Sequence, residues 1–236
     1  MKDAPTNREL SEFKLKDIDK DKLYAFLREM EFNRLLSSVI SAYGEPELSG
    51  SIDEKKIKEK QQAISKKNYH LITNLDQIDE WIKEAEEVGE VAVDTETNSL
   101  DPHQADLVGI SLCSKIGKAC YIPIGHKSSR CINIDAVIKK LKPLLEDPSI
   151  KKIGQNIKFD FIVLFKQGIN ITSMEDTMLM SYVLDAGINR HNMDTLSEIH
   201  LGHKTISFKE IVGTGKKEIN FSEVEINKAK DYAAED

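Results

Sequence analysis

Two acidic residues stand two positions apart at Asp94 and Glu96, directly after the apolar segment VAV. In a regular strand alternate side chains point to the same face, so the two carboxylates would lie together. An isolated pair of acids at this spacing is usually no more than a solvated strand end. Here the residues that lead to the pair are apolar on both strand faces, which is typical of a buried strand. The spacing therefore predicts a strand that delivers two acids to the edge of a sheet.

Three further side chains are candidates to join this pair. Asp160 lies among apolar residues in the segment KFDFIVL, where a carboxylate would be costly to bury without a partner, and a cation would supply one. An aspartate on a helix surface is the simple alternative. Tyr232 and Asp236 are four positions apart, so a helix would place the phenol and the carboxylate on one side.

A cluster of carboxylates is suited to divalent metal ions. Mg²⁺ and Mn²⁺ prefer hard oxygen ligands, and two such ions roughly 3.5–4 Å apart can clamp the attacking and leaving oxygens of a phosphoryl displacement. Zn²⁺ is an alternative. The sequence has neither a G-x-G-x-x-G segment nor a P-loop, so no organic cofactor is indicated. The four acids therefore predict two divalent metal ions as the cofactors.

Charge and composition narrow the class of protein. A net charge of −7 argues against a general duplex-binding module, but a nuclease site built from carboxylates is acidic by design. The apolar runs are too short for a membrane span, and the first residues do not resemble a secretion signal. We expect a cytoplasmic protein with no membrane partner. Cys113, Cys120 and Cys131 have no zinc-site spacing and are interpreted as reduced thiols.

An α/β fold would have to position these acids. Strand-like composition alternates with helical spacing, which indicates a mixed β-sheet flanked by helices, preceded by a short helical N-terminal segment. Asn74 fits the start of a helix, and Ser222 with Glu225 fits a capping box. The strand candidates are 69–73, 90–96, 106–113, 119–124 and 151–155, and the helix candidates are 75–85, 134–145, 159–168 and most of the chain after 176.

The chain divides into three regions by composition. Residues 1–43 contain one or two short amphipathic helices, residues 44–68 form a linker rich in glycine, serine and lysine, and residues 69–236 form the main domain. The lysines of the linker are those of a solvated tether.

Three segments, DTETNSLDP, GQNIKFD and YAAED, carry these acids in this order. They resemble the three exonuclease motifs of the DEDD family, in its tyrosine-containing branch. The residues between them look like the 3′→5′ proofreading exonuclease domain of bacterial DNA polymerase I, over 69–236. The resemblance implies a ribonuclease H-like fold. It also implies that Asp94, Glu96 and Asp236 hold one ion, that Asp94 and Asp160 share a second, and that Tyr232 orients the attacking water.

The same resemblance implies residues that contact nucleic acid. Leu100 would wedge against the terminal base, while Gln155, Asn156, Phe159 and Arg190 would contact the frayed strand. For Leu100 and Phe159, a packing role is the alternative. The implied partners are single-stranded or frayed DNA 3′ ends and, in the full-length protein, a polymerase domain.

The helical segment at residues 23–39 is similar to the end of the 5′ nuclease domain that precedes such exonucleases. We interpret residues 1–43 as a remnant without 5′ nuclease activity, and we expect no templated synthesis from these 236 residues. Because Asp236 follows the last expected helix without further turns in this sequence, we expect it to be displaced or mobile in the absence of metal.

Two other functions share these motifs. A ribonuclease D-like RNA exonuclease would use the same metal site on a different sugar. A catalytically impaired exonuclease fold kept as a structural spacer is the alternative that is not an enzyme, and the presence of all four acids and the tyrosine argues against it.

Overall fold

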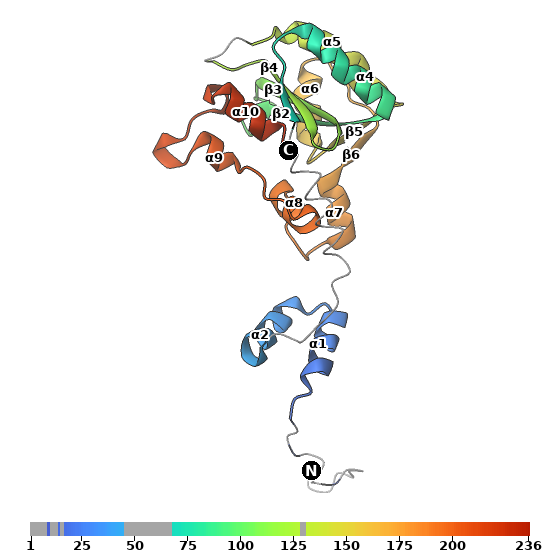
Figure 1. Cartoon of the computed structure of the whole chain (residues 1–236), viewed down its shortest axis with the longest axis vertical. Coiled ribbons are helices and arrows are strands. Elements are labelled where there is room, and N and C mark those ends of the chain that lie inside the picture. Colours follow the sequence, from blue (N-terminus) through green and yellow to red (C-terminus); the bar gives the residue numbers. More distant parts are fainter. Residues whose placement is uncertain (1–8, 10–13, 15–16, 45–67, 128–130) are drawn as a thin grey trace. The chain divides into compact units, whose positions relative to one another are not determined.

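The computed structural model describes residues 9 and 14 and the ranges 17–44, 68–127 and 131–236 (Figure 1). Two compact units divide the chain, Met1–Ile52 and Asp53–Asp236. The expected linker at 44–68 lies outside the described residues except at its two ends. The division into remnant, linker and exonuclease domain therefore stays a prediction.

The first unit contains two short helices, α1 (Lys20–Glu29) and α2 (Asn33–Tyr43), as the sequence predicted. Asp19 caps α1 by accepting a hydrogen bond from the backbone N–H of Lys22 at 3.1 Å. Tyr24 and Leu27 are buried, and the Tyr24 hydroxyl donates to the carbonyl oxygen of Gly44 at 2.5 Å. These contacts hold the two helices together as a hairpin.

The second unit is built on a mixed six-stranded sheet in the order β1-β4-β3-β2-β5-β6. Strands β4, β3 and β2 form an antiparallel meander, whereas the pairs β1–β4, β2–β5 and β5–β6 are parallel. The α/β class with a mixed sheet is confirmed. The strands are β1 (Asn68–Leu71), β2 (Glu90–Thr97), β3 (Leu107–Lys115), β4 (Lys118–Pro123), β5 (Lys151–Gly154) and β6 (Met174–Asp176).

Helices cover both faces of the sheet (Figure 1). On one face α4 (Ile78–Val88), α5 (Ile134–Glu146) and α6 (Lys158–Lys166) enclose the larger apolar core. On the other face α10 (Ile226–Ala233) packs on β1 and β4 around Tyr121 and Phe221. Between α6 and α10 come α7 (Thr177–Asp185), α8 (Met193–Leu201) and α9 (Phe208–Val212). The described residues also contain the short 3-10 helices η2 (Leu75–Gln77), η3 (Gly215–Lys217) and η4 (Phe221–Glu223).

The structure corrects two local predictions. The expected capping box at Ser222 and Glu225 is wrong: Asn220 and Glu223 form the box, and Glu225 itself caps α10. Strand β6 was not expected, because three residues are too few to show a periodicity and pairing with β5 alone makes them a strand. The Asn74 cap is confirmed as a capping box with Gln77, at the start of a short 3-10 turn that leads into α4.

Two further expectations concern the cysteines and membrane insertion. Cys113, Cys120 and Cys131 form no disulfide in the part of the chain that the structure describes. Within the described ranges, none of the helices has the length and apolar character needed to cross a bilayer.

Candidate active site

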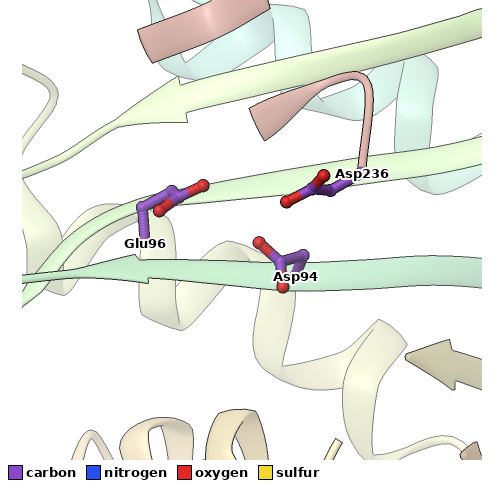
Figure 2. A group of neighbouring side chains, drawn as sticks. All are labelled: Asp94, Glu96 and Asp236. Atoms are coloured by element: carbon purple, nitrogen blue, oxygen red, sulfur yellow. The ribbon is translucent and has the colours of Figure 1, made fainter. Parts of the chain in front are cut away.

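Three carboxyl groups converge at the end of the central strand. Asp94 and Glu96 project from β2, and Asp236 reaches them from the end of α10 (Figure 2). One oxygen of each carboxyl lies within 4.8 Å of the others. Strand β2 lies between β3 and β5 in the sheet, so packing on both sides fixes its two acids. The Asp236 carboxyl turns into the cluster (Figure 2), and its displacement in the absence of metal stays a prediction.

Asp160 approaches the same place from the first turn of α6 and is only 2% exposed. Its Oδ1 accepts two hydrogen bonds from Thr95, one from the backbone N–H at 2.9 Å and one from the hydroxyl at 2.6 Å. The two bonds fix the Asp160 carboxyl beside the backbone that joins Asp94 and Glu96. Asp160 thus lies next to the three converging acids without being one of them.

The four carboxyl groups titrate far from their usual range. Burial raises the pKa of Asp94 to about 6. Burial together with the charge of Asp94 raises the pKa of both Asp160 and Asp236 to about 8. For Glu96, burial and the charges of the other acids raise the pKa well above its usual range. In the absence of cations the cluster therefore holds protons near neutral pH, and a divalent cation could take their place.

Tyr232 lies one helical turn before Asp236. Burial and the charge of Asp236 raise the pKa of Tyr232, and a hydrogen bond between the two side chains stabilises the Asp236 carboxylate. The Tyr232 ring centroid lies 5.9 Å from that of Phe221 and 6.1 Å from that of Phe208. These aromatic contacts fix the ring and direct the protonated hydroxyl toward the acids.

A cleft of about 710 Å³ opens over this cluster. Residues 94–100 line one wall, and Phe208, residues 218–221 and Tyr232 line another. Asp94, Glu96 and Asp236 line this cleft together with exposed apolar side chains such as Leu100 and Ile219. Such a cleft could hold an extended strand with its phosphate at the acids and its base against apolar groups.

The residues expected to contact nucleic acid are in different places. Leu100, Asn156 and Phe159 line the cleft, with Leu100 90% exposed and Phe159 partly buried against the core. Gln155 lines an adjacent cavity of about 280 Å³, and its amide donates to the carbonyl oxygen of His191 at 2.7 Å and accepts from Thr177 at 2.5 Å. Arg190 is exposed between α7 and α8 and is not among the residues that line the cleft.

Sequence reasoning missed three residues at this site. Thr95 holds Asp160, Phe208 forms part of the cleft, and Glu235 anchors the segment that carries Asp236. Thr95 stands between the two predicted acids, and strand alternation could have assigned it to the face opposite them. Nothing in the local sequence distinguishes Phe208 or Glu235 from ordinary packing and surface residues.

The mixed sheet, its helices and the acids at the end of the central strand define a ribonuclease H-like exonuclease fold. Residues 69–236 match the family model described as 3′–5′ exonuclease, so the chain belongs to this exonuclease family, in the form found in DNA polymerase I.

Two DNA polymerase I enzymes are similar to this chain in sequence. The enzyme of Pseudomonas aeruginosa is 38% identical over 236 residues, covering 93% of this chain and 25% of its own length. The enzyme of Rhizobium leguminosarum is 43% identical over 189 residues, covering 71% of this chain and 18% of its own length. The chain thus spans about a quarter or less of these relatives.

A solved structure supports the fold. The complex of Trypanosoma brucei RNase D with RNA U12 superimposes with a TM-score of 0.53 at 16% identity, covering 63% of this chain and 52% of the other. At this identity the likeness shows the fold alone. The sequence relatives favour the DNA polymerase form over a ribonuclease D.

Proposed function

We propose that residues 69–236 remove nucleotides from single-stranded or frayed DNA 3′ ends by hydrolysis that depends on two divalent metal ions. The convergence of Asp94, Glu96 and Asp236 within 4.8 Å in the lining of a cleft carries this proposal. Membership in the 3′–5′ exonuclease family supports the reaction and its polarity.

The donor set fits Mg²⁺ or Mn²⁺ better than Zn²⁺. Asp94, Glu96 and Asp236 offer only carboxylate oxygens, the hard ligands that Mg²⁺ and Mn²⁺ prefer, whereas zinc sites commonly use histidine or cysteine. These three residues would hold one ion, and Asp94 with Asp160 would hold the second. When bound, the ions would supply an activated water and neutralise charge on the phosphate.

The chain's own residues would position the substrate. The Tyr232 hydroxyl, held beside Asp236, would orient the attacking water by a hydrogen bond. Leu100, Phe159 and Phe208 would contact the terminal bases, because all three line the cleft. Asn156 would contact the strand within the cleft, and Gln155 and Arg190 would contact it farther along.

In the full-length protein this domain would serve as the proofreading part of a cytoplasmic DNA polymerase. The length of the relatives supports a polymerase domain as partner. Residues 1–43 would be the remnant of a preceding 5′ nuclease domain, joined through residues 44–68.

The test is a time course on a 5′-labelled single-stranded DNA oligonucleotide, with Mg²⁺ or Mn²⁺ titrated from zero. We expect a ladder of products shortened from the 3′ end that appears only with the metal. Loss of the 5′ label first, or equal rates in EDTA, would contradict the proposal. A matched RNA oligonucleotide separates the two exonuclease types, since faster degradation of RNA would favour the ribonuclease D-like alternative.

A further inference from the structure

We propose that Glu235 is a positioning residue for the active site. It fastens the end of α10 to residues 203–206, and it thereby fixes Asp236 at the acidic cluster and Phe208 at the cleft. The inference rests on the proposed metal site, because its main consequence is a change in metal affinity.

Both oxygens of the Glu235 carboxylate are used. Oε1 lies 2.9 Å from Nε2 of His203, and Oε2 accepts a hydrogen bond from the backbone N–H of Ile206 at 2.7 Å. The Glu235 side chain is only 2% exposed. A buried carboxylate held at two points has a fixed orientation, so it can transmit its own position to the next residue, Asp236.

The segment that receives Glu235 is itself fixed to α8. The Ser197 hydroxyl donates to the carbonyl oxygen of His203 at 3.0 Å, and the Thr205 hydroxyl donates to Oδ1 of Asp194 at 2.6 Å. Ser197 and Thr205 are buried. Glu235 is therefore anchored to a supported segment rather than to a loose loop.

Asp236 needs such an anchor because α10 ends at Ala233. Beyond Ala233, the backbone N–H groups of Glu235 and Asp236 both donate to the carbonyl oxygen of Tyr232, at 3.0 Å and 3.4 Å. The last turn of a helix is its least restrained part. The side chain of Glu235 supplies two further bonds there.

The same contact reaches the nucleic-acid side of the site. Ile206 lies two residues before Phe208, which is the first residue of α9. The Phe208 ring packs against the rings of Tyr232 and Phe221. Releasing Ile206 would loosen the approach to Phe208. Glu235 thus links the metal ligand and one wall of the cleft through a single side chain.

The experiment compares Glu235→Ala and Glu235→Gln with a matched pair on the same helix, Glu225→Ala and Glu225→Gln. Glu225 caps the opposite end of α10 by accepting from the N–H groups of Asn227 and Lys228 at 3.0 and 3.2 Å. The measurements are Mn²⁺ binding by calorimetry, kcat and KM on a single-stranded DNA oligonucleotide, and thermal unfolding.

We expect Glu235→Ala to weaken Mn²⁺ binding about tenfold or more and to raise KM. Glu235→Gln should weaken Mn²⁺ binding much less. Its amide oxygen can still accept from the N–H of Ile206, and its amide N–H can donate to an unprotonated His203 nitrogen. The Glu225 variants should lower the unfolding temperature without weakening Mn²⁺ binding.

Two results would overturn the inference while leaving the proposed function intact. Unchanged Mn²⁺ binding by Glu235→Ala would show that Asp236 is held by other contacts. Equal losses in Glu235→Ala and Glu235→Gln would show that only the charge matters. Absence of Mn²⁺ binding by the wild-type chain would remove the proposed metal site and this inference together.

Discussion

Asp94 is the side chain that links the four acids electrostatically. Its charge contributes to the raised pKa of Glu96, Asp160 and Asp236. It does so although these acids come from β2, from α6 and from the end of α10. Like charges held this close disfavour the folded state, and a cation compensates for them. A residue that destabilises the metal-free fold but gathers ligands is typical of a functional site.

The first prediction is that Asp94→Ala abolishes metal-dependent exonuclease activity without unfolding the domain. The ligand is lost, but the repulsion among the remaining acids also falls, so the metal-free variant should be at least as stable as the wild type. Activity is measured on a labelled oligonucleotide, and stability by thermal unfolding in EDTA.

A matched control is Glu90→Ala, because Glu90 is an exposed acid at the other end of the same strand. It should retain activity. Clear metal-dependent degradation by Asp94→Ala would contradict the assignment of the site.

The second prediction concerns Leu100. Its side chain is 90% exposed, so Leu100→Ala should leave the unfolding temperature unchanged, yet it should raise KM several-fold if the side chain packs on the terminal base. The control is Leu184→Ala, which removes a similarly exposed leucine, 79%, that is not among the residues lining the cleft or the adjacent cavity. An unchanged KM for Leu100→Ala would leave this leucine without a role in binding.

At the scale of elements, β2, α6 and α10 bring their acids to one place although each element is stable for its own reasons. Strand β2 is held between two neighbours, α6 packs on the larger core, and α10 packs on Tyr121 and Phe221. Packing of the elements therefore offsets the repulsion among their carboxyl groups.

The third prediction follows from this repulsion. The folded-state pKa values of Asp94, near 6, and of Asp160 and Asp236, near 8, lie above the usual aspartate value of about 4. The folded state therefore binds more protons than the unfolded state between about pH 4 and pH 8. In EDTA this contribution to stability is complete below pH 4 and is lost as pH rises through 8.

Thermal unfolding of wild type and Asp94→Asn in EDTA across pH 5 to 9 tests the direction of this pH dependence of stability. The stability of the variant relative to wild type should increase with pH, because the asparagine cannot ionise. Mg²⁺ should reduce the loss of wild-type stability at high pH, since it binds the deprotonated carboxylates. A difference that is constant with pH would show that these groups do not titrate as described.

At the scale of the whole molecule, the described part of residues 68–236, which includes the match to the exonuclease family, contains the sheet, the acids and the cleft. Asp94, Glu96 and Asp236 line a cleft whose other lining is partly apolar. Glu96 and Asp160 are buried, so under the proposed function a paired 3′ end would have to open before its last phosphate reached the acids. This geometry favours a separated strand over a duplex.

The fourth prediction is that single-stranded and mismatched 3′ ends are degraded faster than fully paired ends. Opening costs about 1–2 kcal/mol for each base-pair step, and a mismatch has already lost part of that energy. The measurement compares initial rates on one labelled strand, alone, with a matched complement and with a complement mismatched at the last three positions. Equal rates on all three would argue against a requirement for strand separation.

The sequence by itself determined the class of the fold and the local relation within each spaced pair of residues, but it left Asp160 open between a buried partner of a cation and a helix-surface aspartate. Alternation in 90–96 was enough to put Asp94 and Glu96 on one face, and the four-residue spacing related Tyr232 to Asp236 although α10 itself ends at Ala233. These relations are local, because they depend only on the period of one element.

Only the tertiary structure decided which distant side chains meet. It placed Asp236 beside Asp94, bound Asp160 to Thr95, brought Phe208 into the cleft and fixed Glu235 to His203 and Ile206. Each of these contacts joins two elements, so its geometry depends on how the helices pack on the sheet. No local period carries that information, because packing sums many weak contacts between residues far apart in the chain.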